Sequence, residues 1–203
     1  MESLVISASQ SIRYGWEAVK KDFWYFVGIA FISMVISGIG SNSTETNSWD
    51  LVGMLASVWM TCGTTMIYLL YQQGKKAEVT VLFTSVDRFL TVLGATILIS
   101  LIVLAGLILF IVPGIMWAIK YQFVVPLILD QKLGVMEAMR RSDEITKGKK
   151  MSIFMFDLTM LGVVILGALA LLVGLFVAIP VVGLAQIDLY KKLLAATPKV
   201  QTA

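Results

Sequence analysis

LTVLGATILISLIVLAGLILFIV, residues 90–112, contains no charged side chain across 23 positions. A helix of this length rises about 1.5 Å per residue, enough to cross the roughly 30 Å hydrocarbon core of a bilayer. Of all 203 residues, 58% are hydrophobic and 14% charged, against about 45–50% and about 25% in soluble domains. The sequence therefore predicts one integral membrane domain over residues 1–195, followed by a polar C-terminal tail, residues 196–203.

Apolar segments predict six membrane-spanning helices, at about residues 23–39, 51–71, 90–112, 113–130, 152–171 and 174–191. The tract that holds the last two indicates either one long broken helix, and so five spans, or a hairpin that turns near residues 171–174. The positive-inside rule favours six spans. Every Lys and Arg except Lys120 then lies on or beside the cytoplasmic face, whereas five spans would place Lys191, Lys192 and Lys199 outside. We therefore expect both termini in the cytoplasm.

Each predicted hairpin follows a stretch whose apolar residues recur at helical spacing, typical of an amphipathic helix at a membrane surface. The three apolar stripes are Val5, Ala8, Ile12, Trp16 and Val19; Val79, Leu82, Phe83, Val86 and Leu90; and Leu133, Met136 and Met139. The chain thus repeats one unit three times: a cytoplasmic amphipathic interfacial helix, a span, a tight external turn and a second span. The predicted fold class is an all-α membrane protein with six transmembrane helices in three hairpins, the second hairpin turning at Pro113-Gly114.

One charged residue, Lys120, lies inside a predicted span, roughly 10 Å along the helix from Pro113. A charge at mid-depth costs about 2.5–3.5 kcal/mol, and such residues usually face a bundle interior and find a partner. Asp157 in the fifth span is the natural partner, and Tyr121 and Gln122 add hydrogen-bonding groups. Three interpretations stay open for this intramembrane polar site: a structural ion pair, a site for an anionic lipid headgroup or another anion, and a transport-coupling site.

A basic cluster follows the fourth predicted span. Its members are Arg140, Arg141, Lys147, Lys149 and Lys150. Positive charge that fixes the orientation of the neighbouring spans accounts for the cluster by itself. The same residues would also attract anionic lipid headgroups, by about 1 kcal/mol each near the surface. The two roles are compatible.

Composition argues against enzymatic chemistry. The chain has no histidine and a single cysteine, Cys62, so it can form neither a Ser-His dyad, a histidine metal site nor an intrachain disulfide. It also lacks a phosphate-binding glycine loop and an intramembrane aspartyl protease motif. We expect no enzyme, no cofactor and no metal. A nucleic-acid partner is not expected, because no binding fold or aromatic platform is recognisable.

A run of residues in the middle of the chain carries a family resemblance. It comprises Pro113-Gly114, Tyr121, Pro126-Leu127, Asp130, Leu133-Gly134, Glu137-Ala138, Ser142 and Thr146-Lys147-Gly148. This run resembles a bacterial family of polytopic membrane proteins whose domain is named for its fusion to glycerophosphodiester phosphodiesterases. The resemblance implies a six-span protein of the bacterial inner membrane. In fused members catalysis belongs to a separate soluble barrel, for which this chain has no room, so no phosphodiesterase activity is implied.

Two functions are compatible with these features. We expect a non-catalytic inner-membrane protein that binds lipid, anionic lipid above all, or a protein partner, and that supports envelope organisation. A homo-oligomer is compatible with this function. The alternative is a small transporter or permease that uses the polar site around Lys120 and Asp157.

Overall fold

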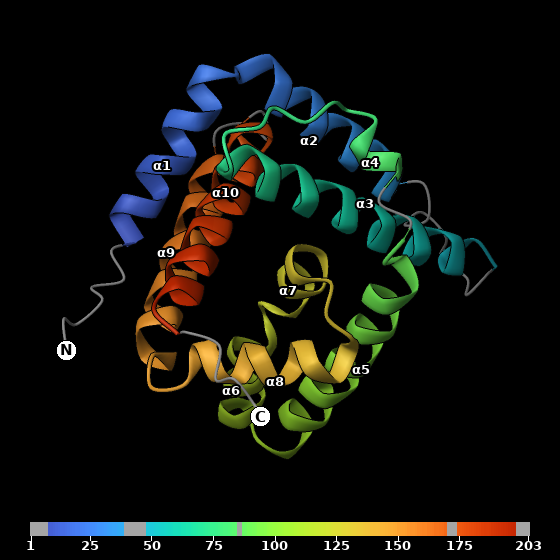
Figure 1. The fold of residues 1–203 in the computed structure, drawn as a ribbon, viewed down its shortest axis with the longest axis vertical. Helices are drawn as coiled ribbons and strands as arrows, with labels where there is room; N and C mark the ends of the chain where they lie inside the picture. Colours follow the sequence, from blue (N-terminus) through green and yellow to red (C-terminus); the bar gives the residue numbers. More distant parts are fainter. Residues whose placement is uncertain (1–7, 39–47, 85–86, 170–173, 198–203) are drawn as a thin grey trace.

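The computed structural model describes residues 8–38, 48–84, 87–169 and 174–197, and all regular structure in these ranges is helical. The helices are α1 (Ala8–Lys21), α2 (Phe23–Gly38), α3 (Ser48–Gln72), α4 (Val81–Thr84), α5 (Phe89–Leu109), α6 (Ile111–Tyr121), α7 (Val124–Gln131), α8 (Val135–Thr146), α9 (Lys150–Leu169) and α10 (Leu175–Ala195). In Figure 1 the short helix α7 lies in the middle, with α3, α5, α8 and α10 around it. This position suits its apolar sequence, VVPLILDQ, in which Leu127 and Ile128 are fully buried.

Four helical segments are long and apolar enough to cross a membrane. They are Leu51–Gln72, Phe89–Leu109, Ile111–Gln131 and Lys150–Leu169. Helix α5 also presents large apolar side chains outward, with Leu101 60% and Ile108 75% exposed. Apolar surface of this extent is uncommon on soluble proteins and fits contact with lipid. The predicted all-α membrane class agrees with these features.

The predicted number of six spans is not confirmed. The first span corresponds to a shorter apolar helix, Phe23–Ile36. The sixth corresponds to α10, which carries Asp188, Lys191 and Lys192 in its second half and is not among the four long apolar segments. The turn expected near residues 171–174 falls mostly outside the described residues. Six spans in three hairpins therefore stay a prediction.

The turn of the second hairpin lies at Phe110 rather than at the predicted Pro113-Gly114. Phe110 is extended (φ −161°, ψ 141°) and separates α5 from α6. Pro113 falls in the first turn of α6, where its missing N–H would have no intrahelical partner in any case. Gly114 allows the two helices to approach, because a Cβ there would lie 2.8 Å from the backbone nitrogen of Leu107. The Pro-Gly pair thus starts a helix instead of forming the turn.

The predicted fourth span consists of two helices, α6 and α7, separated by Gln122 and Phe123. Pro126 lies in the first turn of α7, which again suits a residue without an N–H. At the break, the Ser142 hydroxyl of α8 donates a hydrogen bond of 2.6 Å to the Lys120 carbonyl. An interrupted helix at membrane depth is stable only where such partners satisfy its backbone.

The second predicted amphipathic helix is wrong over most of its length. Residues 75–80 are not helical, and among the described residues of this stretch only the four-residue α4 forms before α5. Gly74, at φ +77°, terminates the preceding helix. Leu82 is fully buried, and its carbonyl accepts a 3.1 Å hydrogen bond from Trp59 Nε1. This segment is therefore held by its contacts with α3, and it does not form the predicted amphipathic helix.

The third amphipathic helix exists as α8, and the predicted stripe is partly right: Met139 is buried and Leu133 is half-buried. Met136 is 72% exposed, whereas Ala138, Ser142 and Ile145 are completely buried. The buried face includes a serine because its hydroxyl reaches the break between α6 and α7. The first amphipathic helix, α1, agrees better: Val19 is buried and Trp16 is half-exposed.

Candidate functional site

A polar cluster connects the N-terminal helix to the last helix. The Asp188 carboxylate of α10 accepts hydrogen bonds from the Ser11 hydroxyl of α1 (2.6 Å) and from Gln72 Nε2 of α3 (3.3 Å). It also pairs with Lys192 one turn further along α10, at 2.6 Å. Asp188 is only 9% exposed. These bonds fix the ends of three helices to one buried carboxylate.

A second carboxylate connects α7 to α10. Asp130, at the end of α7, accepts a 2.8 Å hydrogen bond from the Tyr190 hydroxyl and pairs with Lys191 Nζ at 2.8 Å from both oxygens. The Tyr190 ring stacks on Phe123, with centroids 6.2 Å apart. Polar and apolar contacts therefore hold the central helix against α10 at the same point.

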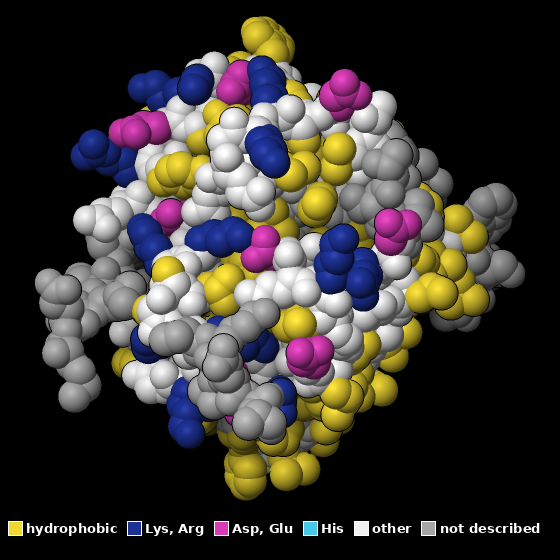
Figure 2. Space-filling view, viewed as in Figure 1, with side chains coloured by type: hydrophobic (Ala, Val, Ile, Leu, Met, Phe, Trp, Pro, Cys, Tyr) yellow, Lys and Arg dark blue, Asp and Glu magenta, His cyan; other side chains and the backbone are white. Residues whose placement is uncertain are grey.

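A third carboxylate, Asp22, lies between α1 and α2. It pairs with Lys76 Nζ at 2.5 Å and accepts a 2.9 Å hydrogen bond from the Tyr71 hydroxyl of α3. The bond from Lys76, with a further contribution from Tyr71, holds the pKa of Asp22 below its usual value. We call the part of the bundle defined by Asp22, Asp130 and Asp188 the charged end. Figure 2 shows charged side chains spread over the face in view, while hydrophobic ones dominate its lower and right-hand rim.

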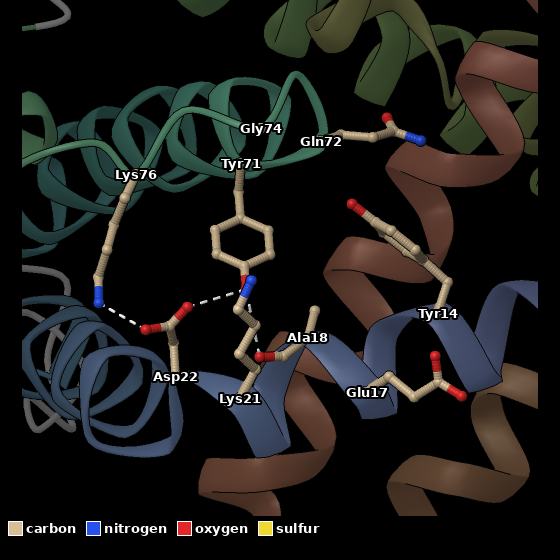
Figure 3. Close-up of a pocket in the computed structure, with 9 residues that line it drawn as sticks. All are labelled: Tyr14, Glu17, Ala18, Lys21, Asp22, Tyr71, Gln72, Gly74 and Lys76. Carbon is tan, nitrogen blue, oxygen red and sulfur yellow. Dashed lines mark hydrogen bonds and ion pairs between the residues drawn. The ribbon is translucent and has the colours of Figure 1, made fainter.

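The charged end encloses a pocket of about 590 Å³ between α1 and the end of α3. Its lining residues are Tyr14, Glu17, Ala18, Lys21, Asp22, Tyr71, Gln72, Gly74 and Lys76. In Figure 3 the rings of Tyr14 and Tyr71 and the Lys21 ammonium extend into the space between the two helices. We call this cavity the charged-end pocket.

Three groups in the charged-end pocket have free hydrogen-bonding capacity. Gln72 Oε1 is buried and has no hydrogen-bond partner among the residues that the structure describes. Lys21 forms no ion pair with any residue that the structure describes. Burial, and next the charge of Asp188, raise the pKa of Tyr14, so its hydroxyl stays protonated as a donor. The pocket therefore offers a cation, a neutral donor and an acceptor to a ligand that bears both an anionic group and a hydrogen-bond donor.

Lys120 has a different partner from the one expected. Its Nζ lies 3.1 Å from Asp143 Oδ2 of α8 and 5.2 Å from the centroid of the Tyr121 ring. Asp157 instead lies near Gln122, whose buried Nε2 makes no hydrogen bond with the described residues. The predicted pairing of Lys120 with Asp157 is wrong. The break after α6 brings α8, and with it Asp143, beside the end of α6. The four residues of the predicted polar site thus divide into two separate groups.

The basic cluster is also divided by the fold. Arg141 is buried and bonds Glu144 at 2.9 Å and the Thr197 carbonyl at 2.5 Å. It is therefore occupied inside the protein and is not free to meet a lipid headgroup. Arg140 is exposed and only loosely paired with Glu144, at 4.0 Å. Lys147 is exposed, and Lys149 and Lys150 are half-buried.

The second half of this chain is similar to one known protein family. Residues 101–197 match the family described as "Protein of unknown function (DUF975)". The DUF975 match covers just under half of the chain and includes α6–α10, so it contains Asp130, Asp188 and the Lys120–Asp143 pair. It begins after α1 and α3, the two helices that line most of the charged-end pocket. No curated protein and no solved structure matches the chain.

The sequence patterns do not predict the charged-end pocket, and all of its lining residues lie outside the DUF975 match. Two pairs of adjacent lysines could have indicated the pocket. They are Lys20-Lys21 and Lys75-Lys76, and each lies beside the end of a predicted span. Such pairs are equally explained by membrane orientation, and nothing in the local sequence shows that α1 and the end of α3 line one cavity. In the described part of the chain, no three His, Cys, Asp or Glu side chains gather where a metal ion could bind.

Proposed function

We propose that this chain is a non-catalytic integral membrane protein that binds a phospholipid headgroup in the charged-end pocket. The observation that supports this function is that Lys21, which has no ion-pair partner among the described residues, lines the same cavity as Gln72, whose buried Oε1 has no hydrogen-bond partner there. A phosphodiester would accept hydrogen bonds from Lys21 and Tyr14. The donor that common headgroups carry, an ammonium or a glycerol hydroxyl, would reach Gln72 Oε1.

The position of the pocket suits this ligand. It lies where the apolar segment Leu51–Gln72 ends and the amphipathic helix α1 runs beside it. Polar side chains at the end of a membrane-spanning helix meet the headgroup layer rather than the acyl chains. The proposal places this end on the cytoplasmic side of a bacterial inner membrane, with both termini there. Arg140, Lys147, Lys149 and Lys150 would add attraction for anionic lipid.

The other expected functions have less support. A transporter built on Lys120 and Asp157 is disfavoured because the two side chains have different neighbours. The resemblance to the family named for its fusion to phosphodiesterases fits a protein domain that is not itself catalytic. A role in envelope organisation would be a consequence of the proposed lipid binding. A protein partner is not required by any contact at the pocket.

Native mass spectrometry of the gently purified protein tests the proposal. Phosphatidylethanolamine or phosphatidylglycerol would be supplied to the wild type, to Lys21→Gln and to Lys20→Gln. Lys20 is the matched control, because it is adjacent, equally charged and placed over the Trp16 ring instead of in the pocket. We expect about tenfold weaker retention in Lys21→Gln, the effect of losing one charge-assisted hydrogen bond, and little change in Lys20→Gln. Equal retention in all three proteins would contradict the proposal.

A further inference from the structure

A second cleft lies at membrane depth, between α2, α3, α9 and α10. Its volume is about 480 Å³, and its walls include Ser33 of α2 and Ser57, Thr61 and Thr64 of α3. Thr64 and Thr61 lie about 12–17 Å from Gln72 along α3, at 1.5 Å per residue. The α3 hydroxyl groups of the cleft therefore lie near the middle of the segment Leu51–Gln72.

The hydroxyl groups on the α3 wall act as acceptors. Each donates its own hydrogen to a backbone carbonyl of the same helix: Ser57 to Met54 (2.8 Å), Thr61 to Ser57 (2.8 Å) and Thr64 to Met60 (2.7 Å). A hydroxyl oxygen that has committed its hydrogen keeps its lone pairs. The α3 wall can thus accept a hydrogen bond from a ligand.

The hydroxyl group on the α2 wall is free to donate. Ser33 Oγ is buried and makes no hydrogen bond within the described part of the chain. A buried hydroxyl without a partner is unfavourable, so a ligand that accepts its hydrogen bond would be stabilised. The two walls together complement one hydroxyl group, which would accept from Ser33 and donate to the α3 wall.

The remaining walls define the rest of the ligand. Met34, Val164 and Ile179 add apolar surface, and no charged side chain is among the lining residues that the structure describes. A mostly apolar cavity with a few converging polar groups is the usual form of a small-molecule site. Without a countercharge at this depth, the ligand must be neutral.

We propose that this cleft binds a neutral, membrane-dissolved lipid alcohol. Its hydroxyl exchanges hydrogen bonds with Ser33 and with the threonine hydroxyls of α3, and its alkyl chain lies along Met34, Val164 and Ile179. An ordinary acyl chain would fill the same volume but would leave Ser33 unsatisfied. The site is independent of the charged-end pocket, since the two cavities share no lining residue.

Photolabelling in vesicles of phosphatidylethanolamine and phosphatidylglycerol tests this proposal. The probe is octanol carrying a diazirine, and the comparison probe is the matching diazirine octane without the hydroxyl. We expect octanol to label peptides from α2 and α3 more strongly than octane does, and unlabelled octanol to compete. Ser33→Ala and Thr61→Val should each lower the labelling about fivefold, as expected for one lost hydrogen bond.

Thr159→Val is the matched control. Thr159 makes the same kind of bond, 2.7 Å from its hydroxyl to the Met155 carbonyl, but it lies on α9 outside the cleft. Its labelling should equal that of the wild type. Because Ser33→Ala removes an unpartnered hydroxyl, its melting temperature should be unchanged or higher, which separates lost binding from lost folding.

Two results would overturn the proposal. Equal labelling by both probes, unchanged in Ser33→Ala and Thr61→Val, would show that the cleft accepts any acyl chain. Absence of labelling together with a cross-linked second copy at α2 and α3 would show that a protein surface covers the cleft.

Discussion

At the scale of single residues, the three carboxylates of the charged end share one arrangement. Asp22, Asp130 and Asp188 each pair with a lysine and accept a hydrogen bond from a hydroxyl group, that of Tyr71, Tyr190 and Ser11 respectively. A poorly solvated ion pair is stable only when further hydrogen bonds satisfy its remaining lone pairs. The hydroxyl groups fulfil that requirement, while each lysine keeps part of its side chain in contact with solvent.

The lowered pKa of Asp22 predicts a pH-dependent stability. The folded pKa lies below the unfolded value of about 3.9, so this contribution is fully present above pH 4 and is lost as the pH falls through the folded pKa. Asp22→Asn should therefore lower the free energy of unfolding by about 1 kcal/mol at pH 7. The difference from the wild type should shrink below pH 4.

Thermal unfolding in detergent between pH 7 and pH 3 measures this difference. Glu17→Gln is the control, because Glu17 and its partner Arg13 are both largely exposed and their pair should contribute little. A difference between Asp22→Asn and the wild type that is constant down to pH 3 would contradict the assignment.

The Lys120–Asp143 pair predicts a specific energetic coupling. A double-mutant cycle of Lys120→Met with Asp143→Leu should give a coupling of about 0.5–1 kcal/mol, since both side chains are partly exposed. The same cycle with Asp157→Leu should be additive, because Asp157 lies near Gln122 instead. Unfolding of all the variants in one detergent provides the comparison. Coupling to Asp157 alone would reinstate the pairing expected from the sequence.

At the scale of helices, the close contact of α5 with α6 depends on Gly106. A Cβ at this position would lie 2.6 Å from the Trp117 ring and 2.9 Å from the Gly114 Cα. Gly106→Ala should therefore destabilise the protein by about 1–3 kcal/mol through overpacking. Gly94→Ala on the same helix meets no atom within 4 Å, so it should be neutral or stabilising. Thermal unfolding of the two variants tests the contrast, and equal melting temperatures would show that the hairpin is not tightly packed.

The same helices show how far sequence patterns predict structure. Long apolar runs predicted α5 and α9 closely, because the hydrophobic length of a segment can be read from that segment alone. The predicted stripe included the buried Met139 of α8 but not Ser142, which is buried because it bonds a carbonyl 22 positions earlier in the chain. The charged-end pocket was hidden for the same reason, because Lys21 and Gln72 are 51 positions apart in the chain and line one cavity only in the folded protein.

At the scale of the whole molecule, the charged end forms one connected network. On α3, Tyr71 bonds Asp22 and the adjacent Gln72 bonds Asp188. On α10, Lys191 follows Asp188 by three residues and pairs with Asp130. Helices α1, α3, α7 and α10 are thereby joined at their ends, while the outward faces of α5 and α9 remain apolar. This separation of polar ends from apolar sides is the arrangement that a bilayer requires of a helical bundle.

The number of spans decides on which side of the membrane each end of the chain lies. Labelling of cysteines introduced one at a time can determine that number. Phe110 is 71% exposed at the turn after α5, Lys75 follows α3, and Ala196 follows α10. The native Cys62 is buried, at 1% exposure, so background labelling should be low. In intact cells a membrane-impermeant maleimide should label Phe110→Cys only. Lys75→Cys and Ala196→Cys should react only after the inner membrane is permeabilised, because six spans place four crossings between them. Labelling of Ala196→Cys in intact cells, with Lys75→Cys still protected, would mean an odd number of crossings, and α10 would then lie along the membrane surface instead of spanning it.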